Sequence, residues 1–403
     1  MDYFRGKRFL DTLPDWEQGR PPEGPLEQYL PRVRAMLRRC GEPQQRFSSV
    51  IVAGTNGKGT TASLLAGLLQ ASGRRVGLYS SPHLHSQRER IQIDGSLLDK
   101  ELWATSLTTF VDATHGFDGE ALGTFSRFEA LTVLAASMFA ELDVDVAVFE
   151  VGLGGRYDAT NAWDHDAAII TQIDLDHCAV LGNDHVTIAD EKLPVARRER
   201  PLFTTGSQQS DVLAHIHRHA EEGEIPLYVC AEKGVTDPSG VLTSYITSAQ
   251  GNARCPRTWV DNARLALATA IHLQPEITGE LAHGVLQAHK WPGRFELAQE
   301  HPRVILDGAH NPAAATALRS DLQPQGAFWT FVVGVNADHE ASELLRCLAP
   351  VASRFIMTSS EHPKALTAED LAQAAPSDIT VNVESGWRAA LVRARQEAGA
   401  EGF

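Results

Sequence analysis

The feature that most constrains this chain is an alternation of apolar runs and amphipathic segments that begins at Phe47. The run FSSVIVAG is followed by a glycine loop and then by KGTTASLLAGLLQASG, in which Leu64, Leu65, Leu68 and Leu69 recur at helical spacing. A second strand-like run, RRVGLYSS, comes next. Because two parallel strands need a long crossover, this order predicts a strand, a helix and a second parallel strand.

The same alternation continues along the next part of the chain. Further strand-like runs are VDVAVFEVG, DAAIITQI, RPLFTTG and IPLYVC, and most are separated by segments long enough to be helices. Strands that alternate with helices are typical of a mainly parallel sheet covered by helices. We therefore expect an α/β fold built on such a sheet.

A second alternating series begins near Arg303. Its strand-like runs are RVILDGAHNP, AFWTFVVGV, SRFIMTSS and DITVNV, with helical patterns between them, and Thr367 with Asp370 fits a capping box at the start of one helix. These roughly 100 residues predict a smaller open α/β domain. The stretch QAHKWPGRFE lies between the two series, and Pro292 with Gly293 makes it the expected hinge.

Composition limits the class of protein. A chain of 403 residues is long enough for more than one core. Its net charge of −15 would repel a nucleic-acid backbone, and no apolar run approaches the ~18 residues that a membrane span needs. The five cysteines show no C-x-x-C spacing, which argues against a disulfide framework and a zinc knuckle. We expect a cytoplasmic protein that binds neither nucleic acid nor membrane, with a monomer as the default.

The loop VAGTNGKGTT, residues 52–61, lies between a predicted strand and a predicted helix. A glycine-rich turn in this position can aim backbone N–H groups and a helix N-terminus at an anion. The loop departs from the common G-x-x-x-x-G-K-[ST] pattern, so a plain strand–helix turn stays the alternative. If the loop binds ATP, Lys58 would contact the β- and γ-phosphates and the Thr60 hydroxyl would bind magnesium.

Two further strand ends carry polar residues. Glu150 ends an apolar strand and precedes the glycine turn GLGGRYDATN, and His177 lies in DLDHCAVLGN after the next strand. Carboxyl ends of parallel strands meet at one edge of the sheet, so Glu150 is a candidate metal ligand and His177 can join it. The alternatives are a solvated strand end, a purely conformational glycine turn and a structural histidine.

Taken together, these motifs resemble folylpolyglutamate synthase/dihydrofolate synthase, the folate branch of the Mur-type amide ligases. The resemblance is carried by VAGTNGKGTTASLLAGLL, YSSPHL, RERIQIDG, FEVGLGGRYDATN, DLDHCAVLG, ADEK, PGRFE and ILDGAHNP, in family order over most of residues 45–375. It implies a P-loop ATPase domain over residues 1–288 and a smaller C-terminal Rossmann-like glutamate ligase domain over 289–403, lacking a last strand that relatives carry.

The resemblance also implies a mechanism. Such ligases use ATP and Mg²⁺ to phosphorylate a folate or dihydropteroate carboxylate, and the amine of L-glutamate then attacks the acyl phosphate, releasing ADP and phosphate. The acceptor, glutamate and ATP are thus the expected small-molecule partners. Two alternatives stay open: a Mur-type ligase for another carboxylate and amino acid, and a nucleotide-binding paralogue without catalysis.

The family's site residues carry over to named positions of this chain. Those implied to bind the nucleotide are Gly54, Thr55, Asn56, Gly57, Lys58, Gly59, Thr60, Asn262, Arg294 and Asp307. Those implied to hold the metal are Thr60, Ser81, Glu150, His177 and Lys192, the last as a carbamoylated lysine. Those implied to act in catalysis are Lys58, Lys192, Asp307 and His310.

Several of these assignments have a simpler alternative. Lys192 is otherwise a solvated lysine beside Glu191, Asn262 a helix N-cap, and Arg294 a surface charge at the hinge. Asn311-Pro312 is otherwise helix-start chemistry.

The chain also departs from the family pattern in two segments. LPVARRERP follows Lys192, where its proline alters the helix. The polar stretch TSYITSAQGNARCPRTW replaces the family's usual approach to Asn262, which makes the adenine contacts less certain.

Overall fold

The computed structural model describes residues 1–20, 24–117, 122–238, 242–243, 259–325, 328–337 and 339–400. The chain forms two compact units. The first comprises the described residues of 1–174, 181–255 and 259–289, and the second comprises 175–180 and the described residues from 290 onward. The expected polar replacement segment, TSYITSAQGNARCPRTW, lies almost wholly outside the described residues.

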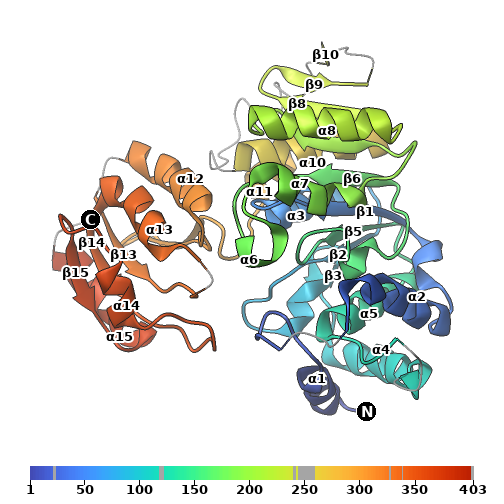
Figure 1. Ribbon diagram of the computed structural model, residues 1–403, viewed down its shortest axis with the longest axis horizontal. Coiled ribbons are helices and arrows are strands. Elements are labelled where there is room, and N and C mark those ends of the chain that lie inside the picture. Colours follow the sequence, from blue (N-terminus) through green and yellow to red (C-terminus); the bar gives the residue numbers. More distant parts are fainter. Residues whose placement is uncertain are drawn as a thin grey trace. The chain divides into compact units, whose positions relative to one another are not determined.

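The described part of the first unit contains a ten-stranded sheet in the order β10-β9-β8-β7-β6-β1-β5-β2-β3-β4 (Figure 1). The strands are β1 Ser48–Ala53, β2 Val76–Tyr79, β3 Ile91–Ile93, β4 Ser96–Leu97, β5 Val146–Glu150, β6 Ala167–Ile170, β7 Leu202–Thr205, β8 Leu227–Ala231, β9 Gly234–Thr236 and β10 Leu242–Thr243. From β8 to β2 all neighbours are parallel, while β3, β4, β9 and β10 pair antiparallel at the two edges. The expected mainly parallel sheet is therefore confirmed.

Helices cover both faces of this sheet. They are α1 Tyr3–Thr12, α2 Tyr29–Arg39, α3 Lys58–Ala71, α4 Lys100–Ala113, α5 Arg127–Glu141, α7 His185–Lys192, α8 Ser210–Glu222, α10 Val260–Leu273 and α11 Gly279–Ala288, with the short α6 Cys178–Leu181 where the two units' ranges meet. One face packs on α2, α4 and α5 near β2 and β5, and on α7 and α8 near β6 and β7. The opposite face is covered by α3 and α10, which pack on each other.

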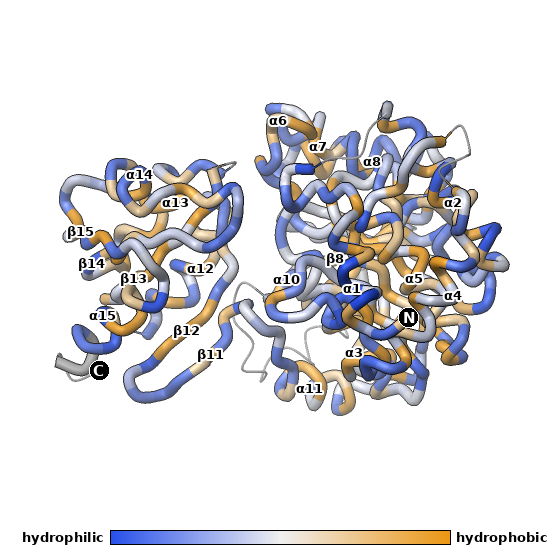
Figure 2. Tube along the Cα trace, turned by 90° about the horizontal axis from the view of Figure 1, so that it is seen from below, coloured by the Kyte–Doolittle hydropathy of each residue, from blue (hydrophilic) through white to orange (hydrophobic). Residues whose placement is uncertain are grey.

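Burial explains why the predicted strands read as continuous apolar runs. In β1 every residue after Ser48 is buried, as expected for a central parallel strand with helices on both sides. On the α5 face, Phe149 of β5 contacts the rings of Tyr79 and Phe139. Gly77 of β2 lies under the Phe139 ring, where a Cβ would overlap it. Figure 2 shows hydrophobic positions concentrated inside each unit.

The second unit is a smaller α/β structure. Its parallel sheet has the order β13-β14-β15, formed by Trp329–Val333, Ala352–Met357 and Thr380–Val383. Its helices are α12 Pro312–Leu322, α13 Ala341–Leu348, α14 Ala368–Gln373 and α15 Trp387–Ala400. Thr367 caps α14 by accepting the Asp370 backbone N–H, which confirms the predicted helix start, and the Asp370 carboxylate accepts the Thr367 hydroxyl.

One predicted strand pairs differently from the rest of its series. β12, Val304–Leu306, does not join the described three-stranded sheet but pairs antiparallel with β11, Glu296–Gln299. The pair forms a short ribbon, and its strands are only partly buried. The loop that carries Asp307 and His310 therefore follows this ribbon and not a strand of the parallel sheet.

His165, just before β6, is a buried histidine whose surroundings disfavour its protonated form. Its Nε2–H donates to the Thr160 carbonyl at 2.7 Å, and its ring packs against Trp163. Nδ1 is buried and has no hydrogen-bond partner among the described residues. Because burial disfavours the imidazolium, the pKa of His165 is lowered to about 4.

This predicts how stability changes with pH. A histidine with a folded pKa below its unfolded value of about 6.5 stabilises the fold above that pH, and this contribution is lost as the pH falls toward 4. His165→Gln keeps a donor for Thr160 and removes the titration. Urea unfolding between pH 7 and 4 measures the free energy of unfolding. For His165→Gln this free energy should fall less steeply with decreasing pH than for the wild type, by up to about 1.4 kcal/mol per pH unit. Equal slopes would contradict this role.

Candidate active site

The loop at residues 54–57 connects β1 to α3 and is hydrogen-bonded to the loop after β6. The backbone N–H groups of Thr55 and Asn56 both donate to the Gln172 carbonyl, at 2.9 and 3.2 Å. The Thr55 hydroxyl donates to the Asp174 carbonyl and accepts the Asp174 N–H, both at 3.0 Å. These four bonds fix the shape of the loop without using the N–H groups that begin α3.

Two glycines give this loop its conformation. Gly54 and Gly57 have φ angles of 140° and 87°, a region that only glycine adopts readily. A Cβ at Gly54 would overlap the Thr171 hydroxyl, and one at Gly57 would overlap the amide of Asn262. Asn262 lies in the first turn of α10, whose N-cap position is held by Trp259, so the N-cap alternative for Asn262 is wrong.

The start of α3 is a candidate anion site. Its N-cap residue is Gly57, which has no side chain to accept the first N–H groups of this 14-residue helix. Lys58, the first helical residue, folds its Nζ back onto the carbonyl oxygens of Gly54 and Thr55, at 3.2 and 3.1 Å. A loop of this kind fits a polyphosphate, which would accept both the N–H groups and the lysine charge.

Glu150 and Ser81 lie together at the carboxyl ends of neighbouring strands. Glu150 is the last residue of β5, is only 5% exposed, and accepts the Ser81 backbone N–H at 2.9 Å. Ser81 follows β2, which pairs parallel with β5. The solvated strand-end alternative for Glu150 is therefore wrong, and a buried carboxylate beside a serine is a donor set that suits a hard cation.

Lys192 is buried, at 3% exposure, which rules out the solvated alternative. It is the last residue of α7, and a 3-10 turn, Leu193–Val195, follows directly with Pro194 inside it. The expected effect of this proline is thus seen as the end of the helix at Lys192. Its neighbour Glu191 pairs instead with Arg156, at 3.1 Å.

The glycine turn after β5 serves mainly to place a buried aspartate. Asp158 accepts the N–H groups of Gly152 and Leu153, at 3.0 and 3.1 Å, and both donors of Thr160. Burial raises the pKa of Asp158. A Cβ at Gly152 would overlap the Phe128 ring, which supports the conformational interpretation of this turn. The sequence analysis gave Asp158 no role, although it stands in the same motif.

In the second unit, Arg294 and Asp307 lie at one loop. The two carboxylate oxygens of Asp307 accept the backbone N–H groups of Phe295 and Ala309, both at 2.8 Å. Although Asp307 is solvent-exposed, desolvation by the surrounding loop raises the pKa of its carboxyl group. Arg294 is half-buried and packs against Gly308, where a Cβ would overlap its guanidinium. Asp307 therefore orders the loop that precedes His310.

The residues after this loop gather around Asp176, which belongs to the 175–180 segment of the same unit. His310 Nε2 and Asn311 Nδ2 each lie 3.3 Å from Asp176 Oδ2. Asn311 also caps α12 and Pro312 is its first residue, so the helix-start interpretation is confirmed. Burial acts to raise the pKa of Asp176, but the hydrogen bond from His310 and the neighbouring histidine charges hold it well below its usual range.

His177 has a left-handed backbone, with φ 49°, and its side chain is 40% exposed. Its ring lies 6.0 Å from the ring of His339, another residue of the second unit that the sequence analysis did not single out. Lys58 and Glu150 belong to the first unit. The predicted meeting of Lys58, Glu150 and His177 in one site therefore stays a prediction.

One cluster of three potential metal-ligating side chains of the His, Cys, Asp and Glu types occurs among the described residues, formed by Asp176, His310 and His339. The metal set implied by the family resemblance draws instead on the hydroxyl groups of Thr60 and Ser81, the Glu150 carboxylate, the His177 imidazole and Lys192.

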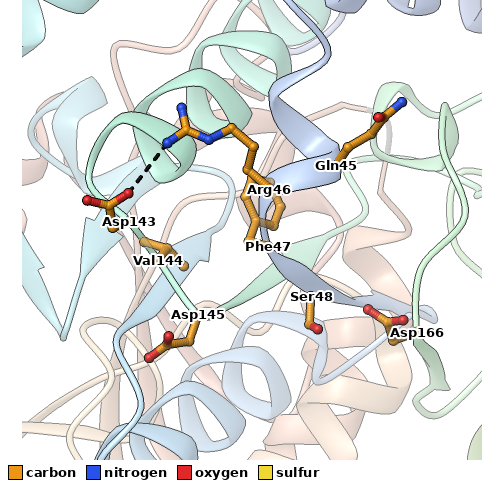
Figure 3. Close-up of a pocket in the computed structure, with 8 residues that line it drawn as sticks. All are labelled: Gln45, Arg46, Phe47, Ser48, Asp143, Val144, Asp145 and Asp166. Atoms are coloured by element: carbon orange, nitrogen blue, oxygen red, sulfur yellow. Dashed lines mark hydrogen bonds and ion pairs between the residues drawn. The ribbon is translucent and has the colours of Figure 1, made fainter.

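A hollow of about 560 Å³ lies at the amino ends of β1, β5 and β6 (Figure 3). It is lined mainly by polar residues that include Arg46, Asp143, Asp145 and Asp166, and Arg46 pairs with Asp143 at 3.4 Å. In parallel sheets ligands bind at the carboxyl ends of the strands, where Glu150 and the glycine loop lie. This hollow is therefore not part of the candidate site.

None of the described helices has the length and apolar character needed to cross a membrane.

Comparison with known proteins adds independent information. Residues 293–402 match the family model "Mur ligase, glutamate ligase domain". The dihydrofolate synthase/folylpolyglutamate synthase of Bacillus subtilis is 30% identical and aligns over 92% of each chain. A probable bifunctional folylpolyglutamate synthase/dihydropteroate synthase of Haloferax volcanii is 36% identical over 80% of this chain, which spans only 40% of that longer protein.

Solved structures agree with these relatives. Mycobacterium tuberculosis folylpolyglutamate synthase complexed with ADP superposes with a TM-score of 0.85 at 28% identity, covering 98% of this chain and 91% of the other. A bifunctional folylpolyglutamate synthase/dihydrofolate synthase with Mn, AMPPNP and L-glutamate bound gives a TM-score of 0.82 at 30% identity, covering 98% and 92%. These findings confirm the expected fold and resemblance, and the chain belongs to the folylpolyglutamate synthase/dihydrofolate synthase family of ligases.

Proposed function

We propose that this ligase uses ATP to join L-glutamate to the carboxylate of a dihydropteroate or folate acceptor through an acyl phosphate. The observation that carries the proposal is the glycine N-cap of α3, Gly57, which has positive φ and whose Cβ position is taken by the Asn262 amide. Relatives of this fold are described as bound to ADP, to AMPPNP with Mn, and to L-glutamate. A matching glutamate ligase domain over residues 293–402 supports the amino-acid substrate.

The chemistry explains why such a site is needed. A carboxylate is a poor electrophile, because its oxygen leaves badly as oxide. Transfer of a phosphoryl group makes that oxygen part of a phosphate leaving group, and the glutamate amine can then displace it. The approach of a carboxylate to a γ-phosphate brings like charges together, so fixed positive groups must offset the repulsion.

Each candidate site residue of the first unit is assigned a part in this reaction. The N–H groups at the start of α3 and the Lys58 ammonium bind the phosphates, and Asn262 borders the loop from α10. Thr60, Ser81 and Glu150 are the side chains of this unit that would hold Mg²⁺, with Lys192 as a carbamoylated ligand and His177 contributed by the second unit's range. When bound, the ion supplies charge that neutralises the phosphate oxygens.

In the second unit, Asp307 orders the loop that presents His310, since both of its oxygens are used by backbone N–H groups. Asp307 and His310 are the side chains assigned to the nucleotide or the incoming glutamate, and Arg294 is assigned to phosphate. We place the ATP-binding domain at residues 1–288 and the glutamate ligase domain at 289–403. We further propose that the protein works as a cytoplasmic monomer on these small molecules, with neither nucleic acid nor membrane as a partner.

The reaction itself can be tested with purified full-length protein and a panel of acceptors. Phosphate release should require ATP, Mg²⁺, L-glutamate and a pteroate or folate together, and the product should gain one glutamate by mass. Release with a different carboxylate or amino acid would favour another Mur-type specificity. Nucleotide binding with no phosphate release under any combination would instead indicate a non-catalytic paralogue.

Gly57→Ala tests the anion site. We expect it to abolish binding of an ATP analogue in calorimetry, because the new methyl group occupies the space beside Asn262 and the backbone is strained. Gly73→Ala is the matched control: Gly73 also has positive φ, at 92°, but its Cβ would meet nothing within 4 Å. It should lose about 1 kcal/mol of stability and keep nucleotide affinity. Equal affinities in both variants would contradict the assignment.

Lys192→Ala tests the buried lysine. Removing a metal-binding carbamate should lower kcat by about a hundredfold or more, and acetate should partly restore it by supplying a carboxylate. Lys233→Ala, at an exposed turn between β8 and β9, provides a control for simple loss of charge. Full activity of Lys192→Ala would remove this residue from the site.

A further inference from the structure

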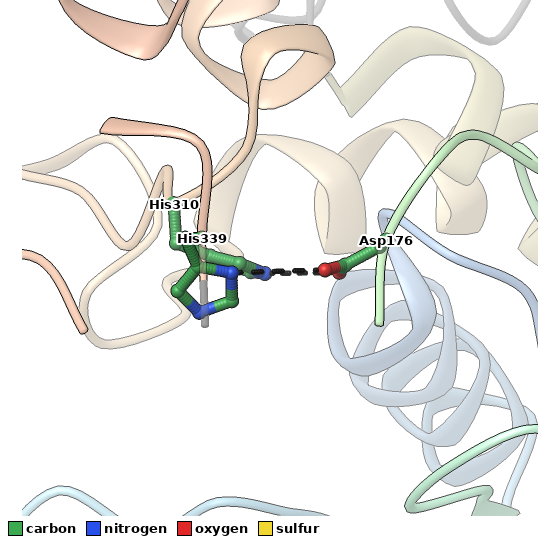
Figure 4. Close-up of side chains that lie close together, drawn as sticks. All are labelled: Asp176, His310 and His339. Carbon is green, nitrogen blue, oxygen red and sulfur yellow. Dashed lines mark hydrogen bonds and ion pairs between the residues drawn. The ribbon is translucent and has the colours of Figure 1, made fainter. Parts of the chain in front are cut away.

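The cluster formed by Asp176, His310 and His339 has features of a metal site that the family resemblance does not imply. The three side chains come from separate parts of the second unit: the 175–180 segment, the loop after β12 and the loop after β13 (Figure 4). Both imidazoles point toward the carboxylate. One ligating atom from each residue lies within 4.8 Å of the others.

Hydrogen bonding fixes the tautomer of His310. Its Nδ1 lies 2.8 Å from the Gly308 carbonyl oxygen. A carbonyl only accepts, so Nδ1 carries a proton and donates it. In the neutral imidazole, Nε2 then has a lone pair directed at Asp176 Oδ2. Nε2 is therefore the ring atom with which His310 could bind a metal ion, and it lies 3.3 Å from Asp176 Oδ2.

The distances are compatible with a metal ion. A protonated imidazole normally approaches a carboxylate to about 2.7–2.9 Å. Two ligands each about 2.0–2.1 Å from a tetrahedral Zn²⁺ lie roughly 3.3–3.4 Å apart. The observed 3.3 Å between His310 and Asp176 matches the second value. His339 Nδ1 lies 3.7 Å from the other oxygen of Asp176.

The surroundings of the cluster are those of a supported ligand set. Metal-binding histidines commonly donate their other N–H to a backbone carbonyl, as His310 does to Gly308. The side chain of Asp176 is only 8% exposed, and its Oδ2 also accepts the Asn311 amide. The imidazole rings of His310 and His339 lie 4.7 Å apart between centroids.

From these observations we propose that Asp176, His310 and His339 bind a divalent transition-metal ion of the Zn²⁺ class. Two imidazoles and one carboxylate suit Zn²⁺, while Mg²⁺ prefers oxygen ligands. Three protein ligands leave one tetrahedral position for water or a substrate group. The ion fastens the 175–180 segment to the loops after β12 and β13 of the same unit. This site shares His310 with the proposed ligase site, but Zn²⁺ binding is measured without ATP or an acceptor, so its failure and that of the ligase function are distinguishable.

The test is Zn²⁺ binding to the full-length protein without nucleotide, by equilibrium dialysis in excess Mg²⁺ that saturates oxygen-rich sites. The wild type should retain one Zn²⁺ per chain. His339→Ala and Asp176→Asn should each weaken this binding by about tenfold to a hundredfold or more. His217→Ala, which removes an exposed histidine from α8, should bind like the wild type.

A second readout separates lost ligands from lost fold. Co²⁺ in place of Zn²⁺ should give the wild type the visible absorption of a four-coordinate site, and His339→Ala should lose it while keeping the wild-type circular dichroism. If the wild type binds no Zn²⁺ in excess Mg²⁺, the cluster is a proton-linked ion pair and the proposal fails. It also fails if the correctly folded His339→Ala variant binds Zn²⁺ as tightly as the wild type.

Discussion

The candidate site of the first unit depends on one structural constraint, the parallel pairing of β1 with β5 on one side and β6 on the other. In this register Val52 lies opposite Glu150, and Ala53 lies opposite Ile170. The loops after all three strands must then begin side by side. The bonds from Thr55 to Gln172 and Asp174 extend this pairing beyond the sheet.

The candidate site holds charged side chains in buried positions, where they lose hydration free energy. Glu150 and Lys192 are both buried in the first unit, although a charged group loses several kcal/mol of hydration when it leaves water without compensation. The Ser81 N–H offsets part of that cost for Glu150. A fold that keeps such groups at strand and helix ends has them ready for a charged ligand, which replaces the lost water with fixed partners.

The local elements could be predicted from sequence because their signals are local. Apolar runs next to segments with helical spacing predicted the parallel strands from β8 to β2. The Thr367 cap was predicted from the residues at the start of its own helix. The pairing of β12 with β11 could not be seen, since a three-residue strand carries no sign of its partner. The sequence motifs correctly placed Glu150 at the end of a strand and Lys58 at the start of a helix. They did not identify the hydrogen-bond partners of either residue.

Contacts between distant segments account for most of what the sequence analysis missed. Asp176 is next to a residue that was singled out, yet its importance comes from His310 and His339, more than 130 residues away. Asn262 was placed by resemblance, and only the three-dimensional contact with Gly57 shows why that glycine has no side chain. Such relations depend on how loops meet, which no spacing along the chain encodes.

The central claim is that a carboxylate is activated by direct phosphorylation. It can be tested most directly with an acceptor whose carboxylate carries ¹⁸O at both oxygens. The acyl-phosphate route transfers one of these atoms to the released phosphate and leaves the other in the new amide, so mass spectrometry should find one ¹⁸O in each phosphate formed during ligation. Unlabelled phosphate accompanying labelled amide product would contradict the account.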